Sequence, residues 1–316
     1  VITVQSIPEY DKAHSTVITI GTFDGVHIGH RKILERLTKS AKKLGLKSTV
    51  LTFYPHPRMV LQKDADIKLL NTIKEKTKIL EQSGLDFLII HPFTKEFSRL
   101  SATEFVRDLL VNDLCAKKII IGYDHRFGRN RNANISDLIA FGNSLDFEVE
   151  QISAQEIDDV SVSSTKIRKA LQEGDVQTAN SYLGYNYMLT GIVKRGKGIG
   201  RQLNFPTANL NIEEAYKLIP KNGSYVVQCK IDQRTVFGMM NIGLNPTIQD
   251  KTALPDGRKE SIEVHFFNFD EDLYDRSLQI DILERLRDEQ KFESVEALKE
   301  QLARDKEKSL SIIARK

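Results

Sequence analysis

The feature that most constrains the fold is a change in the hydrophobic pattern part-way along the chain. As far as Ile152, short apolar segments alternate with segments in which apolar residues recur every three or four positions. Strands separated by amphipathic helices indicate βαβ units and a parallel sheet. We therefore expect strands at 17–21, 48–53, 87–91, 118–122 and 147–152, with helices at 27–44, 72–82, 103–114 and 135–143.

A different pattern follows Met188. Strand-length runs succeed one another with only turn residues between them, which is typical of a small antiparallel barrel or sandwich. The runs are 188–196, 224–231, 235–243, 261–269 and 277–286, preceded by short helical segments at 165–171 and 176–183 and followed by a helix with apolar positions Phe292, Val295, Leu298 and Leu302. At 316 residues the chain is long for one domain. We predict an α/β domain over 1–184 and an antiparallel β domain with a C-terminal helix over 185–316.

Composition excludes several classes of protein. The formal net charge of +3 and the lack of a long Lys/Arg block argue against a nucleic-acid partner. The longest apolar runs are strand-sized, well short of the roughly 18 residues of a membrane span. Cys115 and Cys229 are isolated, which favours two structural thiols in a reducing compartment. With no leader pattern at the start, we expect a soluble cytoplasmic protein without an obligatory protein partner.

The segment GTFDGVHIGH, residues 21–30, joins the first predicted strand to the first helix. A helix start carries unpaired N–H groups and the positive end of the helix dipole, so it attracts anions. His27 and His30 are expected to project from one helical face, with Gly29 leaving room for a ligand. Zinc pairs on helices are usually four apart with a further ligand nearby, so nucleotide phosphates fit better. Two surface histidines at a helix start are the alternative, which the surrounding GTFDG disfavours.

A second anion site is predicted in SVSSTKIR, residues 161–168. Hydroxyls at Ser163, Ser164 and Thr165 stand at a predicted helix start, with Arg168 one turn later. A Ser/Thr cluster alone is usually only a helix cap. Together with the histidine pair, however, the segment can hold the other end of a triphosphate.

The glycine-rich stretch at 191–210 supports two interpretations. Gly191 to Lys197 fits the pattern of a phosphate loop, but Gly198 stands where Ser or Thr would bind magnesium. Gly196, Lys197 and Gly198 can still fold over phosphates through backbone amides and the lysine ammonium. A mobile hairpin fits this stretch equally well.

The segment PTAN and a strand glutamate supply the groups that a kinase needs. Thr207 and Asn209 are two apart, so on an extended segment they point the same way and offer the oxygen ligands that Mg²⁺ accepts beside phosphate. Glu263 lies in a strand whose residues 262, 264 and 266 form the opposite, apolar face. A carboxylate directed into a barrel is costly unless it is paired or used. Glu263 is therefore a candidate base for an alcohol nucleophile, with a solvated outer-face glutamate as the alternative.

With both halves interpreted, the chain resembles the bacterial bifunctional riboflavin kinase/FAD synthetases over essentially its whole length. The matching segments, in the family's order, are GTFDGVHIGH, FYPHP, IGYDHRFG, SVSSTKIR, GRQLNFPTANL and RDEQKF. The letters HIGH also resemble class I aminoacyl-tRNA synthetases, but their lysine-rich KMSKS loop is missing from the sequence. The weak net charge and the barrel sequence further disfavour a tRNA ligand.

The resemblance implies a fold, two reactions and a set of site residues. The fold is a nucleotidyltransferase-like, Rossmann-like α/β domain followed by an antiparallel β-barrel riboflavin kinase domain. The barrel would phosphorylate riboflavin with ATP and Mg²⁺ to give FMN, and the first domain would adenylylate FMN with ATP to give FAD and pyrophosphate. In the first domain, the resemblance implies ATP-phosphate binding by Gly21, Phe23, Asp24, Gly29, His27 and His30, and pyrophosphate binding by Ser163, Ser164, Thr165 and Arg168. It implies that Asp124 and Phe127 line a nucleotide or flavin pocket. In the barrel, it implies a loop at 196–200 that closes over the nucleotide, magnesium ligands at Thr207 and Asn209, the base Glu263, and Arg287 near the flavin entrance.

The sequence departs from the family pattern in the first half. Tyr54 stands where an acidic residue often precedes PHP, His125 where an aromatic is common, and Ala133–Asn134 where a Gly-Asp pair is common. These departures concern the FMN and adenine pockets more than the reaction. They support one alternative, in which only the kinase is active and the first domain binds nucleotide. A non-catalytic flavin-binding regulator is a further alternative, against which Thr207, Asn209 and Glu263 argue.

Overall fold

The computed structural model describes residues 1–62, 67–123, 125–153, 162–196, 200, 203–244 and 260–315. Contacts within the chain divide it into two compact units, Val1–Ser164 and Thr165–Lys316. Each unit has its own sheet. In the part of the chain described, no helix has the length and apolar character needed to cross a bilayer.

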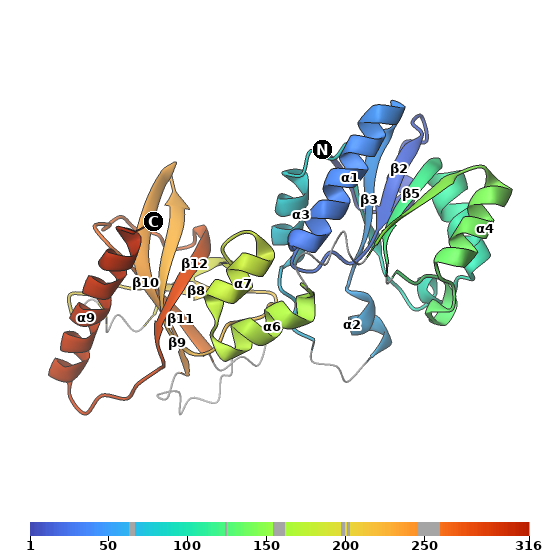
Figure 1. Cartoon of the computed structure of the whole chain (residues 1–316). Helices are drawn as coiled ribbons and strands as arrows, with labels where there is room; N and C mark the ends of the chain where they lie inside the picture. The colour runs from blue at the N-terminus through green and yellow to red at the C-terminus, as the bar shows by residue number, and fades with distance from the viewer. Residues whose placement is uncertain are drawn as a thin grey trace. The chain divides into compact units, whose positions relative to one another are not determined.

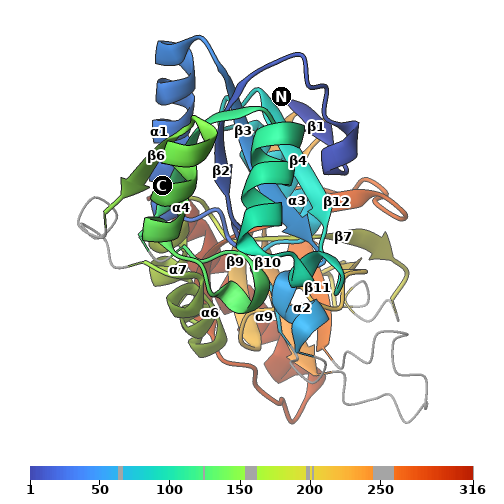
Figure 2. The ribbon, with the colours of Figure 1, turned by 90° about the vertical axis from the view of Figure 1, so that its right-hand side faces the viewer.

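The first unit is built on a six-stranded parallel sheet in the order β1-β4-β3-β2-β5-β6. The strands are β1 (Ile2–Val4), β2 (Thr16–Ile20), β3 (Lys47–Tyr54), β4 (Phe87–Pro92), β5 (Ala116–Gly122) and β6 (Glu148–Ile152). Figure 2 shows β6 and β1 at opposite edges of this sheet. All five residues of β2 are buried, because helices cover both faces of a parallel sheet. The predicted parallel α/β architecture is confirmed.

Helices pack on both sides of this sheet, with α1 (Ile28–Leu44) and α3 (Ile73–Glu81) on one side and α4 (Ile135–Leu145) on the other (Figure 1). Gly45 ends α1 in the left-handed conformation at φ 66°, as the sequence predicts. The predicted helix at 103–114 forms as η3 (Glu104–Asp113), but with π-helical turns: the Leu114 N–H donates to the Leu109 carbonyl, five residues back. Sequence periodicity did not predict β1 or the short helices η1 (Ile7–Glu9), α2 (Pro57–Leu61), η2 (Phe97–Arg99) and η4 (Arg129–Arg131).

The second unit is a closed antiparallel barrel in the order β10-β11-β8-β7-β12-β9, so the predicted choice between barrel and sandwich resolves to a barrel. Its strands are β7 (Met188–Lys194), β8 (Ala208–Asn211), β9 (Gly223–Ile231), β10 (Arg234–Leu244), β11 (Glu260–Phe266) and β12 (Ser277–Arg287). The predicted C-terminal helix forms as α9 (Val295–Ile313). Its Ile312 packs against Val226, Leu283 and Leu286, so α9 covers the outside of the barrel wall.

Two further helices, α6 (Ser164–Glu173) and α7 (Val176–Leu183), precede the barrel. Hydrogen bonds attach both of them to it: the Lys221 N–H donates to the Leu171 carbonyl at 3.0 Å, and the Asn180 amide donates to the Ile282 carbonyl at 2.9 Å. By contacts, therefore, α6 from Thr165 onward and α7 belong to the barrel unit.

A buried ion pair fastens α9 to β12. The Arg287 guanidinium donates from Nη2 to Oδ2 of Asp305 at 2.7 Å and from Nε to the same oxygen at 2.9 Å. The Asp305 side chain is 4% exposed and that of Arg287 is 16% exposed. Arg287 also lies over the Phe292 ring, with its guanidinium carbon 5.8 Å from the ring centroid. The structure thus gives Arg287 a packing role, while its predicted place at a flavin entrance stays a prediction.

Replacing Asp305 with Asn should lower the free energy of unfolding of the barrel unit by about 2–4 kcal/mol, because the Arg287 charge would stay largely buried without its partner. Urea denaturation followed by circular dichroism would measure the change. Asp270→Asn is the matched control, since Asp270 is exposed. Equal denaturation midpoints for the two variants would contradict this account of the pair.

Candidate active sites

The turn between β2 and α1 is strained. Phe23 and Val26 have positive φ angles of 47° and 35°, and Gly25 lies between them at 84°. Left-handed backbone is costly for side chains such as these and persists only where the surroundings hold it. Here the surroundings are the core, since Phe23 is 2% and Val26 0% exposed. Gly21 makes room for the Phe23 ring: a Cβ at Gly21 would lie 3.1 Å from Phe23 Cε2.

Asp24 fixes this turn to two distant parts of the chain. Its buried carboxylate accepts the Leu70 N–H at 2.9 Å, and its carbonyl accepts the Ser164 hydroxyl at 2.9 Å. The two predicted anion segments, 21–30 and 161–168, therefore meet at Asp24 and Ser164 within the first unit. The Asp24 carboxylate is engaged with backbone, so its contribution to the site is to hold the turn.

The two histidines lie together, but not in the way that helical periodicity predicts. His27 is the N-cap of α1 and has extended backbone; its Nδ1 accepts the His30 N–H at 3.4 Å. The two rings stack with centroids 3.7 Å apart and planes 17° from parallel. Because Nδ1 of His27 is used as an acceptor, its neutral ring carries the proton on Nε2, which can donate to a ligand. Only His30 belongs to the helix itself, since His27 precedes it as the N-cap, but the stacked rings do lie on one side as expected.

Both imidazoles are neutral in the free protein. Burial lowers the pKa of His27 to about 4. Burial, followed by the neighbouring His27 and Lys76, lowers the pKa of His30 well below its ordinary value. Nδ1 of His30 is buried and makes no hydrogen bond to any residue that the structure describes. A buried polar atom without a partner is costly, so a ligand that supplies one would bind favourably here.

Stability of the first unit should therefore depend on pH through His27. Its pKa is 6.5 in the unfolded chain and about 4 in the folded one, so between these values the unfolded chain binds more protons. The contribution is complete above pH 6.5 and is lost as pH falls toward 4. A shift of this size corresponds to roughly 3 kcal/mol.

His27→Asn tests this dependence, because Asn can still cap the helix but does not titrate. Urea denaturation of both proteins at pH 7.0, 5.5 and 4.5 would give the two slopes. We expect the wild type to lose more stability than the variant across this range. Parallel loss in both proteins would contradict the assignment of the effect to His27.

The remaining residues of the second anion segment lie at the start of α6. Ser163 and Thr165 are exposed, and Arg168 is half-buried one turn into the helix. Their arrangement is that of a helix N-terminus with hydroxyl groups, and pyrophosphate binding by them stays a prediction. Asp124 lies outside the described residues, as does Ser161.

The predicted flavin-pocket residue Phe127 lies in the core. It is 6% exposed, and its ring is 6.0 Å from that of Phe105 and 6.3 Å from that of His125. Its backbone exchanges hydrogen bonds with Ala133. Asn134 then caps α4, its side chain accepting the Ser136 N–H at 2.7 Å. Asn134 thus serves as a cap as an aspartate would, whereas the exposed Tyr54 at the end of β3 has no such explanation in the structure.

In the barrel, the proposed base and a proposed metal ligand are in contact. The Thr207 hydroxyl donates to Oε2 of Glu263 at 3.1 Å. Asn209 pairs directly with Glu263 in the register of β8 and β11, so their side chains share one face of the sheet. Three side chains from this part of the barrel therefore converge, as the sequence analysis expects of a kinase site.

This face is the outside of the barrel wall. His265 follows on the same side as Glu263 and pairs through Met239 with Val226, on which α9 packs. The opposite face of β11 carries Ile262, Val264 and Phe266, which are at most 6% exposed. Glu263 does not point into the barrel interior. Glu263 is half-buried, so its environment is neither the barrel interior nor the fully solvated outer face considered from the sequence.

Glycines bring the neighbouring loop close to these groups. A Cβ at Gly196 would lie 2.2 Å from Nδ2 of Asn209, and one at Gly200 would lie 3.2 Å from Oγ1 of Thr207. A side chain at Gly196 would displace the Asn209 amide, and one at Gly200 would collide with the Phe205 carbonyl at 2.3 Å. Lys197 and Gly198, predicted to contact phosphates, lie outside the described residues.

His265 is a site neighbour that the sequence analysis did not single out. Its Nδ1 lies 2.8 Å from the Pro206 carbonyl, and its ring contacts Phe205 with centroids 5.1 Å apart. Burial lowers its pKa, so the ring is neutral and Nδ1–H donates to Pro206. The contact holds the residue before Thr207 in place. The sequence could have indicated His265, because it stands two residues after Glu263 and therefore lies on the same face of the strand.

Two family models match the chain in succession. The FAD synthetase model covers residues 9–166, and the riboflavin kinase model covers residues 183–313. A protein named bifunctional riboflavin kinase/FMN adenylyltransferase from Listeria monocytogenes is 36% identical over 95% of this chain and 93% of its own. The chain belongs to this family.

Other relatives agree along the same length. Proteins of the same name from Bacillus subtilis and Escherichia coli K12 are 33% and 34% identical, over 93% and 92% of this chain and 92% and 90% of their own. A solved structure titled as a macrolide-efflux protein from Streptococcus pneumoniae superimposes with a TM-score of 0.85 at 30% identity, covering 97% of each chain. The titled activity is that protein's; for this chain the likeness supports the fold.

Proposed function

We propose that this chain makes FMN from riboflavin in its barrel and FAD from FMN in its parallel-sheet unit, using ATP in both reactions. One observation carries the proposal. His27 and His30 lie in the first compact unit, most of which the FAD synthetase model covers, and Thr207, Asn209 and Glu263 lie in the second, within which the riboflavin kinase model falls.

In adenylyl transfer, a phosphate oxygen of FMN attacks the α-phosphorus of ATP and pyrophosphate leaves. The protein needs no covalent nucleophile, since positioning and charge stabilisation supply most of the catalysis of such transfers. Nε2–H of His27 and the His30 ring would donate to the phosphate oxygens on which negative charge develops. Ser163, Ser164, Thr165 and Arg168 would hold the leaving pyrophosphate. Asp124 and Phe127 remain proposed contacts of the nucleotide or flavin.

In riboflavin phosphorylation, the terminal hydroxyl of the ribityl chain attacks the γ-phosphorus of ATP and ADP leaves. Glu263 would accept the hydroxyl proton, with the Thr207 hydroxyl orienting its carboxylate by the hydrogen bond that the two share. The 196–200 loop would close over the nucleotide. Arg287 stays a proposed neighbour of the flavin entrance.

Thr207 and Asn209 fit a magnesium ion. Their hydroxyl and amide oxygens are hard ligands, and the glycines at 196 and 200 leave a cradle around them that a Cβ would fill. The described residues contain no cluster of three or more His, Cys, Asp or Glu able to hold a metal by themselves, so phosphate oxygens and water would complete the coordination. Bound Mg²⁺ would neutralise charge on the ATP phosphates.

The organisation and location of the protein complete the proposal. We assign the transferase to 1–184 and the kinase to 185–316; by contacts, α6 from Thr165 onward and α7 group with the barrel. Two free cysteines, one buried, agree with a reducing cytoplasm. The partners we propose are small molecules alone: riboflavin, FMN and ATP.

A time course with purified protein, riboflavin, ATP and Mg²⁺, with the flavins separated by chromatography, tests the proposal. FMN should form first and FAD should follow. FMN that accumulates without FAD would leave only the kinase, and unchanged riboflavin would overturn the assignment of the barrel.

A further inference from the structure

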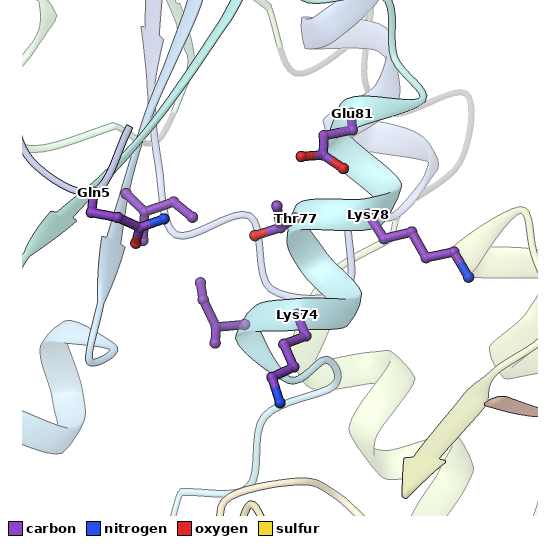
Figure 3. A pocket seen from close by; sticks show the side chains of 7 residues that line it. Gln5, Lys74, Thr77, Lys78 and Glu81 are labelled. Atoms are coloured by element: carbon purple, nitrogen blue, oxygen red, sulfur yellow. The ribbon is translucent and has the colours of Figure 1, made fainter. Parts of the chain in front are cut away.

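A lysine is buried beneath the histidine site. Lys76 lies on α3 and is 8% exposed, whereas Lys74 and Lys78 on the same helix are more accessible. Figure 3 shows these two lysines on α3, where both line a shallow surface pocket to which Lys76 does not contribute. A capping box between Thr72 and Glu75 fixes the start of α3 and so the place of Lys76.

The Lys76 ammonium lies at the carboxyl ends of two strands, where ligands of parallel sheets bind. Nζ donates to the Thr22 carbonyl at 3.1 Å and to Oγ1 of Thr52 at 3.0 Å. Thr22 belongs to the GTFDGV turn that leads to His27. The Thr52 hydroxyl donates to the same Thr22 carbonyl at 3.3 Å. One ammonium thus contacts both the turn and β3.

Among the described residues, this buried charge has no carboxylate within ion-pair distance. Within the described part of the chain, Lys76 forms no ion pair with a carboxylate, and Asp24 acts on it only through a longer-range attraction. Burial lowers its pKa to about 8, so the ammonium is still mostly charged at neutral pH. Burying a charge is costly unless something compensates for it. A bound anion near Lys76 would supply that compensation.

The charge of Lys76 acts on His30. It is close enough to lower the pKa of His30, whose buried Nδ1 has no protein partner among the described residues. Among the described residues, a lysine without an ion pair and a ring nitrogen without a partner therefore both lie at the GTFDGVHIGH segment, the lysine through its hydrogen bond to the Thr22 carbonyl. An anion placed here would satisfy both.

We propose that Lys76 is a positioning residue for adenylyl transfer, holding the Thr22 turn and supplying from beneath it a buried positive charge that draws the ATP phosphates onto His27 and His30. The inference rests on the proposed transferase function and adds a further contributor to phosphate binding beside the two histidines. The ammonium acts through the turn and through its field, without touching the reacting atoms.

The test compares Lys76→Met and Lys76→Gln in the full chain, with FMN and ATP as the only substrates. Gln keeps an N–H donor for the Thr22 carbonyl but loses the charge. We expect both variants to raise the KM for ATP in FAD formation by about tenfold or more. The melting temperature of Lys76→Gln should equal or exceed that of the wild type, because an uncompensated buried charge is removed while a donor to the Thr22 carbonyl is kept. Lys76→Met also loses the hydrogen bond that holds the turn, so its melting temperature should be lower than that of Lys76→Gln. A merely structural lysine would leave the KM of Lys76→Gln for ATP unchanged.

Two controls separate the possible failures. Lys74→Met removes an accessible charge from the same helix and should leave every parameter unchanged, and riboflavin phosphorylation should be unchanged in all variants. Wild-type kinetics in Lys76→Gln would overturn the inference, since hydrogen bonding alone would then suffice. If the wild type makes no FAD, the proposed transferase function fails. If the wild type makes FAD and the Lys76 variants have the same KM for ATP, only the inference about Lys76 fails.

Discussion

Replacing His27 and His30 together with Ala should abolish FAD formation while leaving riboflavin phosphorylation intact. Removing one preorganised donor from a transition-state site costs about 10²–10³ in rate. The two rings stack 3.7 Å apart, so their losses are not expected to multiply independently, and we expect a combined loss of at least about 10³. Rates of FAD formation from supplied FMN, and of FMN formation from riboflavin, would be measured on the same preparation.

His14→Ala is the matched control, because His14 is an exposed histidine of the same unit. It should leave both rates unchanged. Equal loss of both activities in the double variant would contradict the assignment of one reaction to each unit. Retained FAD formation would remove the histidines from the transferase site.

The second large effect concerns the barrel. Glu263→Gln should reduce riboflavin phosphorylation by about 10²–10⁴, the range typical of a lost general base, while FMN supplied from outside is still converted to FAD. Glutamine keeps the size of the side chain and can still accept the Thr207 hydroxyl, so the loss would report the missing base rather than a collapsed site.

Glu293→Gln serves as the control, since Glu293 is exposed and lies outside the barrel strands. The decisive measurement is the rate of ADP release with riboflavin present. If the Glu263→Gln variant phosphorylates riboflavin at the wild-type rate, another group takes the proton and Glu263 is not the base.

Both architectures could be predicted from the sequence because they depend on periodicity. The strand TVITI at Thr16–Ile20 is buried throughout, as a strand covered on both faces of a parallel sheet must be, and α1 keeps its apolar residues on one face up to Gly45. The strands after Met188 follow one another without helices, which leaves an antiparallel arrangement. These patterns are local, so one sequence carries them.

The features that could not be predicted depend on how the barrel closes and on residues that depart from the hydrophobic periodicity of helices. Alternation places Glu263 opposite Ile262 and Val264, but which face is outside is set only when the barrel closes. His27 caps α1 through its ring, a role that Ser, Thr, Asn or Asp usually fills, so the pattern placed it inside the helix. Lys76 did leave a signal, a lysine in the buried stripe of α3 with Ile79 and Leu80, and only its contacts show what the signal means.

The hydrogen bond between Asp24 and Ser164 has a consequence for the order in which the protein matures. The two residues are 140 positions apart. A nascent chain can pair β2 with β3 early, but the strained turn gains this contact only after nearly all of the first unit has been synthesised, since domains form from the N-terminus as the chain emerges. The transferase site is therefore among the last parts of its unit to be completed, although its histidines are among the first residues made.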